Sequence, residues 1–340
     1  DSNLNISELT SSVKETDLLT LIYTSGTTGM PKGVMLSHKN IMSNISAVSQ
    51  LQKDLYNESF LSFLPLSHVL ERMAGHFFPM SINSRIFYAE NIDTVGVNMG
   101  EVSPTIVTCV PRFFEKMYDK IMQGVNEASS IKRKLFNWSI KVGRDYTYIA
   151  SAGYKIPSFL KLKRSIAKKL VYDKLKMKFG NNIKYFISGG APLSRDIAEF
   201  FASLDITILE GYGLTETSPV LCSNVPGKVK FGTVGFPLSN VEIKIAKDGE
   251  ILVKGENVML GYWRKKADTE QVIKDGWLHT GDIGEIDSND GYIKITDRKK
   301  DIIVSAGGDN ISPAKIENQL SNFPEIDQCM VYGDGKNYLV

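Results

Sequence analysis

The sequence predicts an α/β fold, in which helices cover a mostly parallel sheet. A small antiparallel β subdomain follows, and the beginning of a small α+β C-terminal domain comes last. In residues 1–228, short apolar runs rich in β-branched residues alternate with helical patterns, which is typical of parallel strands joined by helices. In residues 229–298, polar and apolar residues alternate and Asp-Gly pairs interrupt them, as in antiparallel hairpins. Residues 299–340 form the third expected unit.

The first unit should begin with two strands around a polar loop. Residues 18–24 (LLTLIYT) form a continuous apolar run with the length of a buried strand, and GVMLS forms the second strand. Ser37 is a suitable N-cap for a helix over 38–51. Further strands are expected in FLSFLPL, RIFYAE, TIVTCV, IKYFISGG and ITILEGY, and helices at about 67–80, 93–100, 111–124 and 194–204. Most of 111–180 should be helical.

Turn and cap residues organise the remainder. Asp248-Gly249 and Asp290-Gly291 mark the turns of two hairpins. Near the C-terminal end, DIIVS reads as a strand, and Ser312 followed by Pro313 combines an N-cap with a first-turn proline. We therefore expect a strand, a glycine-containing loop and a helix in this part.

Composition narrows the class of protein. With 40 basic and 38 acidic residues, the chain lacks the charge of a bulk nucleic-acid binder, and we expect no nucleic-acid partner. No apolar run reaches the ~18 residues needed to span a bilayer, and no signal peptide opens the chain. The three cysteines are far apart and lack metal-type spacing. A reducing, cytoplasmic setting without a zinc site is expected.

Both ends of the chain are expected to lie inside a longer protein. The chain starts at Asp1 rather than at Met, and a polar segment runs directly into a strand. At the other end, CMVYGDGKNYLV reads as a strand pair that stops within a motif.

The segment from Lys155 to Lys184 is strongly basic, with ten Lys or Arg and one acidic residue, Asp173. Two interpretations are open. Such a run is usually the solvated face of a helix, but it also suits attraction to anionic lipid or to a phosphorylated substrate. Peripheral contact with the inner face of a membrane therefore remains an alternative to a purely cytoplasmic location.

The loop YTSGTTGMPKGVMLSH (residues 23–38) suits phosphate binding, although it is not a Walker-type phosphate loop. That motif needs Gly-Lys-Ser/Thr, whereas here Lys32 follows Pro31 and precedes Gly33. Glycines in such a loop allow backbone N–H groups to face an anion, the hydroxyls add donors, and Lys32 adds a mobile positive charge. An ordinary Gly/Thr-rich hairpin loop is the alternative for this stretch taken alone.

Four motifs in order resemble the AMP-forming adenylating enzymes, which include acyl-CoA synthetases, peptide-synthetase adenylation domains and luciferases. They are the loop above, GYGLTETSP (211–219), WLHTGDIGEIDSNDGYIKITDRKKD (277–301) and SAGGDNISPAKIE (305–317). SGGAPLS (188–194) resembles the segment that lies along the adenine and the acyl chain. LPLSHVLERMAGHFFP (64–79) and VPRFFEKMYDKI (110–121) resemble the long-chain fatty acid–CoA ligase branch. The three expected units would then be two parts of a large adenylate-forming domain and the start of the C-terminal domain.

The resemblance implies roles for particular residues. Tyr212 would stack on adenine, Glu216 would bind Mg²⁺ through a hard oxygen ligand, and Asp282 would accept both ribose hydroxyls. The implied nucleotide-binding residues are Thr24, Ser25, Gly26, Thr27, Thr28, Gly29, Gly190, Ala191, Gly211, Tyr212, Gly213, Asp282 and Arg298. The implied catalytic residues are Lys32, Thr215, Glu216 and His68. Lys300 matches the hinge between the domains, and Gly307 and Gly308 match the loop that lines the path of coenzyme A.

The implied reaction is ATP-dependent conversion of a long-chain fatty acid to acyl-AMP, followed by thioester formation with coenzyme A, and Mg²⁺ accompanies ATP. Two alternatives remain: a fatty acyl-AMP ligase that loads a carrier protein, and a noncatalytic protein that binds nucleotide or acyl-adenylate. Family members also carry an adenylation lysine, whose motif would lie beyond Val340. We therefore expect this chain alone to be weakly active or inactive.

Overall fold

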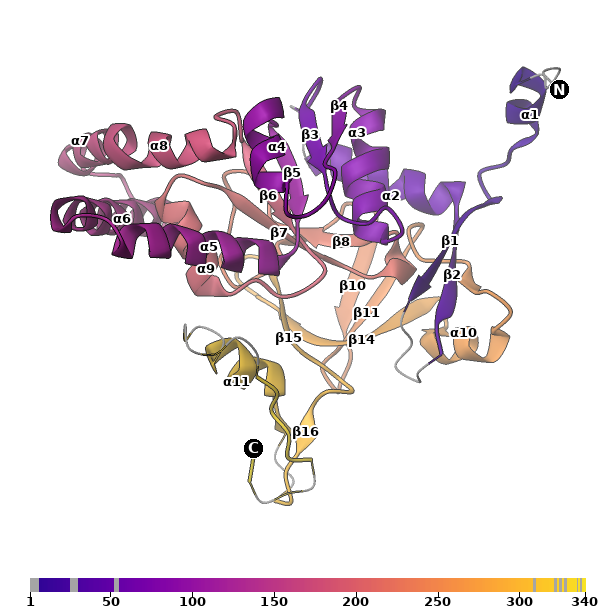
Figure 1. Cartoon of the computed structure of the whole chain (residues 1–340). Coiled ribbons are helices and arrows are strands. Elements are labelled where there is room, and N and C mark those ends of the chain that lie inside the picture. Colours follow the sequence, from indigo (N-terminus) through magenta and orange to yellow (C-terminus); the bar gives the residue numbers. More distant parts are fainter. Residues whose placement is uncertain are drawn as a thin grey trace.

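The computed structural model describes residues 6–24, 30–51, 55–307, 310–320, 323, 326, 329–334, 336 and 338–340. A seven-stranded sheet with the order β4-β3-β5-β6-β7-β8-β9 forms its centre (Figure 1). The strands are β3 (Ser59–Ser62), β4 (Arg85–Tyr88), β5 (Ile106–Cys109), β6 (Tyr185–Ser188), β7 (Ile208–Gly213), β8 (Val220–Ser223) and β9 (Phe236–Pro237). The first five in spatial order are parallel, whereas β8 and β9 are antiparallel to their neighbours. The predicted mostly parallel sheet is confirmed.

The parallel strands carry apolar side chains on both faces. In β3, Phe60 contacts one cluster of buried side chains and Leu61 contacts another, and Ile106 and Val107 of β5 divide in the same way. Adjacent residues of a strand point to opposite faces, so a strand that is covered on both sides is apolar throughout. This is the physical reason for the continuous apolar runs in the sequence.

Helices cover both faces of this sheet. One face carries α4 (Val95–Val102), α5 (Pro111–Asn126), α6 (Ser130–Ser151), α7 (Ser158–Ala167), the π-helix η2 (Lys168–Tyr172), α8 (Asp173–Lys176), the 3-10 helix η3 (Met177–Phe179) and α9 (Arg195–Ser203). The other face carries α2 (His38–Leu51), the π-helix η1 (Glu71–Phe77) and α3 (Phe78–Ser81). In Figure 1, α6, α7 and α8 extend to one side of the molecule and α1 (Ile6–Ser12) stands apart at the other.

Two antiparallel sheets complete the larger part of the chain. A three-stranded sheet joins β1 (Leu18–Thr24), β2 (Lys32–Ser37) and β12 (Gly261–Tyr262). A five-stranded sheet joins β10 (Val241–Ile245), β11 (Glu250–Gly255), β13 (Ile273–Lys274), β14 (Trp277–Ile286) and β15 (Ile293–Arg298), and α10 (Lys266–Val272) lies between β12 and β13 in the chain. The hairpins expected at the two Asp-Gly pairs are confirmed by the pairs β10–β11 and β14–β15.

The structure corrects one detail of the sequence interpretation. The run LLTLIYT (β1) has the length of a buried strand, but Ile22 is its one buried residue and Tyr23 is 63% exposed. The strand pairs antiparallel with β2 and has no place in the parallel sheet. The proposed division at residues 228 and 298 stays a prediction, because β9 and β12 of the middle range pair with strands of the first.

Helix caps lie where the sequence places them. The backbone N–H of Asn40 donates to Ser37 Oγ at 3.1 Å, and Asn40 Oδ1 accepts from the backbone N–H of Ser37 at 2.8 Å. This reciprocal pair satisfies N–H groups at the start of α2. At the start of α11 (Pro313–Leu320), Ser312 Oγ accepts the backbone N–H of Lys315 at 3.2 Å. Both predicted caps are confirmed.

The C-terminal part contains β16 (Ile303–Val304), β17 (Asn310–Ile311) and α11. The two strands pair antiparallel, and α11 packs near β15 (Figure 1). The backbones of Tyr332 and Val340 exchange two hydrogen bonds, of 2.8 and 2.9 Å. A strand, a loop and a helix are therefore present in the expected order.

Within the residues that the structure describes, none of the helices is both long and apolar enough to cross a bilayer. The longest of them, α6 with 22 residues, carries Lys132, Arg133 and Lys134 near its start.

The contact between α6 and α9 yields a test of the packing. A Cβ at Gly143 would lie 1.9 Å from the backbone carbonyl oxygen of Ser203, so Gly143→Ala must push the two helices apart. We expect a loss of about 1–3 kcal/mol in the free energy of unfolding, measured by urea denaturation. Gly124→Ala in α5 is the matched control, because nothing lies within 4 Å of its Cβ position. Alanine there should be neutral or add up to ~1 kcal/mol; equal stability of the two variants would contradict the packing.

Candidate functional site

A cavity of about 810 Å³ opens beside the carboxyl ends of β6 and β7. In open parallel sheets this edge is the usual place for ligands. Four segments that are far apart in the sequence line the cavity: the β1–β2 hairpin, the start of η1, the ends of β6 and β7, and the β14–β15 region with residues 298–301. Polar groups therefore converge from several elements on one cavity, as in a small-molecule site.

Most of the predicted site residues line this cavity. They are Thr24, Lys32, His68, Gly190, Gly211, Tyr212, Gly213, Thr215, Glu216, Asp282, Arg298 and Lys300. Ala191 and Gly307 do not line it; Ala191 is exposed beyond Gly190, and Gly307 lies in a turn after β16. Ser25, Gly26, Thr27, Thr28, Gly29 and Gly308 lie outside the described residues.

Asp282 is the centre of a buried polar network. The Tyr212 hydroxyl donates to its Oδ2 at 2.6 Å, and Arg298 Nε lies 3.5 Å from its Oδ1. Asp282 and Arg298 are also register partners across β14 and β15, which brings the two side chains together. Burial raises the pKa of Asp282 above its ordinary value, and Tyr212 and Arg298 oppose that shift. The carboxylate is thus oriented from two sides at the cavity wall.

Glu216 lies on a tightly held turn. It belongs to the 3-10 helix η4 (Thr215–Thr217), and its backbone carbonyl accepts the N–H of Met259 at 2.8 Å. Asn257 Nδ2 donates to the carbonyl of Thr217 at 2.9 Å, and the Tyr262 hydroxyl donates to Glu216 Oε1 at 2.7 Å. The turn and the carboxylate are therefore positioned by the segment that leads into β12.

Lys32 is held by a carboxylate and an aromatic ring. Its Nζ lies 2.8 Å from Asp268 Oδ1 in α10 and 5.1 Å from the centroid of the Tyr262 ring. The side chain of Lys32 is only 15% exposed, which limits screening of its charge by water. The lysine ammonium and the Glu216 carboxylate thus share Tyr262 as a common neighbour.

His68 lines the cavity in its neutral form. The backbone N–H of Leu70 donates to His68 Nδ1 at 3.2 Å, so this nitrogen is unprotonated and the proton resides on Nε2. Burial lowers the pKa of His68, which favours the same neutral form. Val69, Leu70 and Met73 continue the cavity wall from His68 as an apolar surface.

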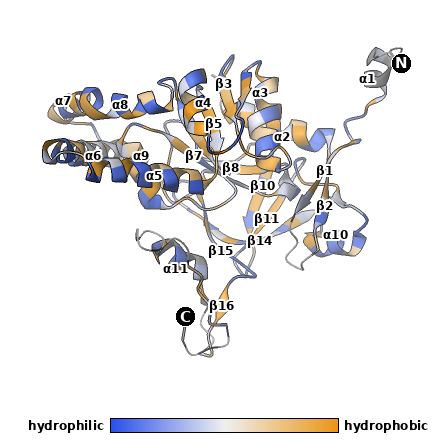
Figure 2. Ribbon diagram, in the orientation of Figure 1, coloured by the Kyte–Doolittle hydropathy of each residue, from blue (hydrophilic) through white to orange (hydrophobic). Residues whose placement is uncertain are grey.

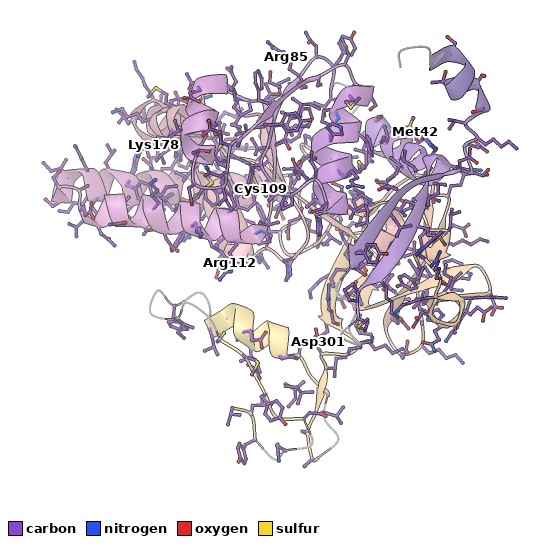
Figure 3. All side chains as sticks on the ribbon, turned by 45° about the vertical axis from the view of Figure 1, so that its right-hand side comes forward. Met42, Arg85, Cys109, Arg112, Lys178 and Asp301 are labelled. Atoms are coloured by element: carbon purple, nitrogen blue, oxygen red, sulfur yellow. The ribbon has the colours of Figure 1, made fainter. Side chains whose placement is uncertain are left out.

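The segment after β15 is anchored beside the cavity. Lys299 Nζ contacts Asp248 Oδ2 at 2.7 Å and Glu250 Oε2 at 3.0 Å. Its neighbours Lys300 and Asp301 line the cavity, and Asp301, labelled in Figure 3, lies where the chain leaves β15 for the C-terminal part. A movement of that part would therefore begin at residues that border the site.

The described residues contain no group of three or more His, Cys, Asp or Glu side chains that would hold a metal ion by themselves. Glu216 nevertheless fits Mg²⁺, because carboxylate oxygen is a preferred ligand and the side chain faces the cavity in a fixed orientation. Mg²⁺ is commonly bound by one or two carboxylates, water and the phosphates of a nucleotide. The donor set matches a metal that enters with its nucleotide.

Comparison with known proteins identifies the family. The family model described as AMP-binding enzyme matches residues 2–263. This chain belongs to the AMP-binding enzyme family. It is 39% identical over 332 residues to the long-chain-fatty-acid–CoA ligase FadD15 of Mycobacterium tuberculosis, covering 96% of this chain and 54% of that protein. It is 36% identical over 353 residues to the long-chain-fatty-acid–CoA ligase ACSBG2 of Rattus norvegicus, covering 99% and 52%. The chain thus spans about half the length of these curated relatives.

Solved structures of adenylating enzymes share the fold. The o-succinylbenzoate CoA synthetase of Bacillus subtilis, in complex with an acyl-adenylate intermediate, superposes with a TM-score of 0.70 at 24% identity, covering 94% of this chain and 56% of that one. Apo MatB from Rhodopseudomonas palustris gives a TM-score of 0.67 at 26% identity, covering 94% and 56%. The predicted fold class and the resemblance to the family are confirmed.

Several residues that shape this candidate site were missed from the sequence. Tyr262 and Asp268 position Glu216 and Lys32, and Asn257 holds the η4 turn. The segment GYWRKK, which contains Tyr262, gave a weak indication of a functional residue. The sequence around Asp268 and Asn257 gave no such indication, because an acidic helix residue and a loop asparagine are common at any surface. Their importance depends on contacts across 236 and 40 residues of chain.

Two predicted glycines have a reason other than nucleotide approach. A Cβ at Gly213 would lie 1.8 Å from the carbonyl oxygen of Pro219, so the β7–β8 pair excludes any larger residue there. Gly190 has φ of +83°, a conformation that side chains disfavour. The glycines of this site are therefore required by the backbone itself.

A buried acid lies behind the apolar cavity wall. Glu71 in η1 is 0% exposed. Within the described residues, neither of its carboxylate oxygens makes a hydrogen bond that meets the usual limits of distance and angle. Its carboxyl lies over Gly75, where a Cβ would be 2.2 Å from Oε1. Burial raises the pKa of Glu71 to about 7, and the Ser62 hydroxyl offsets part of the shift. Glu71 is therefore largely protonated below neutral pH.

This raised pKa predicts a pH-dependent stability. In the unfolded chain Glu71 ionises near pH 4.5, whereas in the fold it ionises near 7. The unfolded state loses its proton first as pH rises, so stability should fall between about pH 4.5 and 7, by up to about 3 kcal/mol. Urea denaturation across this range should show a weaker decline for Glu71→Gln than for the wild type.

Two comparisons sharpen that measurement. Glu210, whose pKa burial also raises to about 7, stays in both proteins, so the difference between them reports Glu71. Glu101→Gln, at an exposed position of α4, is the matched control and should reproduce the wild-type curve. If the free energy of unfolding depended on pH in the same way for the wild type and Glu71→Gln, Glu71 would be ionised in the fold.

Proposed function

We propose that this chain is the nucleotide- and acyl-binding part of an AMP-forming long-chain fatty acid–CoA ligase. One observation carries the proposal: Thr24 and Lys32, Thr215 and Glu216, and Asp282 and Arg298 come from three separate motifs and line a single cavity. Membership in the AMP-binding enzyme family and the similarity to the long-chain-fatty-acid–CoA ligases FadD15 and ACSBG2 support it.

The proposed chemistry has two steps. A carboxylate oxygen of the fatty acid attacks the α-phosphorus of ATP, the bond to the bridging oxygen breaks, and pyrophosphate leaves with acyl-AMP formed. The sulfur of coenzyme A then attacks the acyl carbon, the carbon–oxygen bond to AMP breaks, and the thiol proton passes to solvent or a base. Positioning and neutralisation of charge along the triphosphate are the main tasks of the protein in such reactions.

The adenosine end is proposed to bind at β7 and β14. The Tyr212 ring offers a flat face for adenine while its hydroxyl is fixed on Asp282. The Asp282 carboxylate accepts two hydroxyls well, which suits the ribose, and Arg298 is the second ribose contact. Gly190, Gly211 and Gly213 border this part of the cavity.

The phosphates are proposed to lie between the β1–β2 hairpin and η4. Lys32 and Thr24 of the hairpin and Thr215 of η4 line this part of the cavity. Lys32 would exchange Asp268 for a phosphate oxygen, and its position over Tyr262 restricts the path of that exchange. Ser25, Gly26, Thr27, Thr28 and Gly29 are proposed as further donors. When bound on Glu216, Mg²⁺ supplies Lewis-acid neutralisation of the phosphate charge.

The acyl group is proposed to follow the apolar wall that begins at His68. Val69, Leu70, Met73, Ala74 and Phe78 line that side of the cavity, and Phe78 is 1% exposed. A wall of this kind suits a hydrocarbon chain. The Nε2–H of neutral His68 is available at its mouth to a carbonyl or carboxylate oxygen.

The remaining roles are proposals of the same kind. Lys300, beside the anchored Lys299, is the proposed hinge of the C-terminal part, and Gly307 and Gly308 are proposed to border the coenzyme A path. The units 1–228, 229–298 and 299–340 are proposed as the two parts of the large domain and the start of the C-terminal domain.

The ribose assignment has a direct test. Asp282→Asn keeps an acceptor for Tyr212 but removes the charge, so the KM for ATP should rise about 10- to 100-fold in the full-length protein. Glu285→Gln, on the exposed part of the same strand, is the matched control. An unchanged KM for ATP in Asp282→Asn, with both variants folded, would remove Asp282 from the nucleotide site.

The activity itself is tested by exchange of pyrophosphate into ATP. The full-length protein should show exchange that rises from acetate to palmitate, because longer chains cover more of the apolar wall. This chain by itself should exchange weakly or not at all. Product formation with coenzyme A or with a carrier phosphopantetheine separates a CoA ligase from a carrier-loading ligase. Binding of MgATP without exchange for any acid would leave the noncatalytic alternative.

A further inference from the structure

The helix α7 has two apolar faces, and only one of them is covered. Leu160 and Ala167 are buried against the body of the protein. The other face, which we call the outer stripe, consists of Phe159, Leu162, Ile166 and Leu170, with exposed fractions of 63%, 64%, 44% and 40%. Leu170 belongs to the π-helix η2, which continues α7 directly. Burial against the protein therefore accounts for two of these six apolar residues.

The outer stripe is continuous. Its members are separated by three, four and four residues, the spacing that places side chains above one another on one face of a helix. Single exposed apolar residues are normal on a protein surface, but a contiguous row marks an interaction site. The stripe therefore needs a partner surface.

α7 is held firmly while it exposes this stripe. Arg164 contacts Asp205 Oδ1 at 2.5 Å and packs 4.0 Å from the centroid of the Tyr146 ring. Just beyond η2, Lys176 contacts the same Asp205 at 3.0 Å, and the Tyr172 hydroxyl donates to the carbonyl of Ser139 at 2.6 Å. The inner face is thus fixed on α6 and on Asp205, which follows α9, and the outer stripe is exposed.

Lysines surround the outer stripe. Lys163 Nζ lies 5.5 Å from the centroid of the Phe159 ring, and Figure 2 shows hydrophilic and hydrophobic residues side by side along α7 and α8. The exposed lysines of this region are Lys155, Lys161, Lys163, Lys168, Lys169, Lys174 and Lys178. In the described part of the chain none of these seven forms an ion pair, whereas Arg164, Lys176 and Lys184 do. The charge around the stripe is uncompensated.

We propose that the outer stripe docks the protein on an anionic lipid surface. Apolar side chains would enter the boundary of the acyl region, and the lysines on either side would reach the headgroups along their flexible stems. Each basic residue close to an anionic membrane raises the partition roughly fivefold. A protein partner fits less well, because the cores of protein interfaces are depleted of lysine. The proposal does not rest on the ligase activity.

The test is co-sedimentation of the full-length protein with vesicles. Vesicles of phosphatidylcholine mixed with phosphatidylserine should retain the protein, and vesicles of phosphatidylcholine alone should retain much less. Added salt should lower the binding, since it screens the lysines. Failure to sediment with the anionic vesicles at low salt would overturn the proposal.

Two pairs of variants locate the surface. Phe159→Ser with Leu162→Ser, and Lys163→Glu with Lys169→Glu, should each lower vesicle binding at least roughly tenfold. The matched controls are Val97→Ser with Met42→Ser, also exposed apolar residues, and Lys116→Glu with Lys120→Glu on α5. Thermal unfolding should show that all four proteins fold. Wild-type binding by both stripe variants would place the lipid contact elsewhere on the protein. Equal losses of binding in the control variants would show that the protein is held by general electrostatic attraction.

A thiol probe decides between lipid and other occupants. Leu162→Cys in the full-length protein should react rapidly with a maleimide without vesicles and slowly with anionic vesicles, measured against the parent protein. Slow reaction without vesicles would show that another segment or a second copy covers the stripe, and the oligomeric state would tell these apart. Slow reaction without vesicles would overturn docking on lipid, whether another segment or a second copy covers the stripe.

Discussion

Two buried asparagines hold together the parts of the chain on which the candidate site depends. Asn44 of α2 exchanges hydrogen bonds with both the N–H and the carbonyl of Val220, and Asn257 donates to the carbonyls of Thr217 and Val220. Both asparagines are 0% exposed. The turn after β7 carries backbone groups that would otherwise be buried without partners, at a cost of about 1–3 kcal/mol each. The amides therefore join α2, this turn and the segment before β12 into one rigid unit.

This rigid unit allows charged groups to face the cavity in fixed orientations. Each of the main charges is restrained by a neighbour from another element: Glu216 by Tyr262, Asp282 by Tyr212, and Lys32 by Asp268. The restraints link the seven-stranded sheet with the three-stranded and the five-stranded sheets. A site that is organised before its ligand binds spends less free energy on ordering its side chains during binding. Because the cavity is partly buried, its charges also interact more strongly with a bound ligand than they would in water. The position of the C-terminal segment, next to Lys299 and Asp301, places any movement of that segment at the edge of this volume.

The order and type of most elements were predictable because local patterns carry them. The apolar runs of β3, β5 and β6 reflect burial on two faces, the Asp-Gly pairs reflect turn geometry, and the caps at Ser37 and Ser312 reflect unpaired N–H groups. The pairing of strands was less predictable. β1 reads as a buried strand because seven residues of sequence do not distinguish a parallel sheet from an antiparallel hairpin. In the same way, α7 reads as a basic helix face, and its exposed apolar stripe emerges only when the buried face is known.

The sequence by itself determined the family and the chemical types present at the site, because these depend on short motifs with fixed spacing. Thr24, Lys32, Tyr212, Glu216 and Asp282 were identifiable in this way, and all of them line the cavity. Only the tertiary structure decided how these groups are held. The protonation of His68 follows from one backbone N–H, the restraint of Lys32 comes from a residue 236 positions away, and the raised pKa of Glu71 follows from complete burial. Each depends on distance and exclusion of water, which are properties of the folded chain rather than of its order of residues.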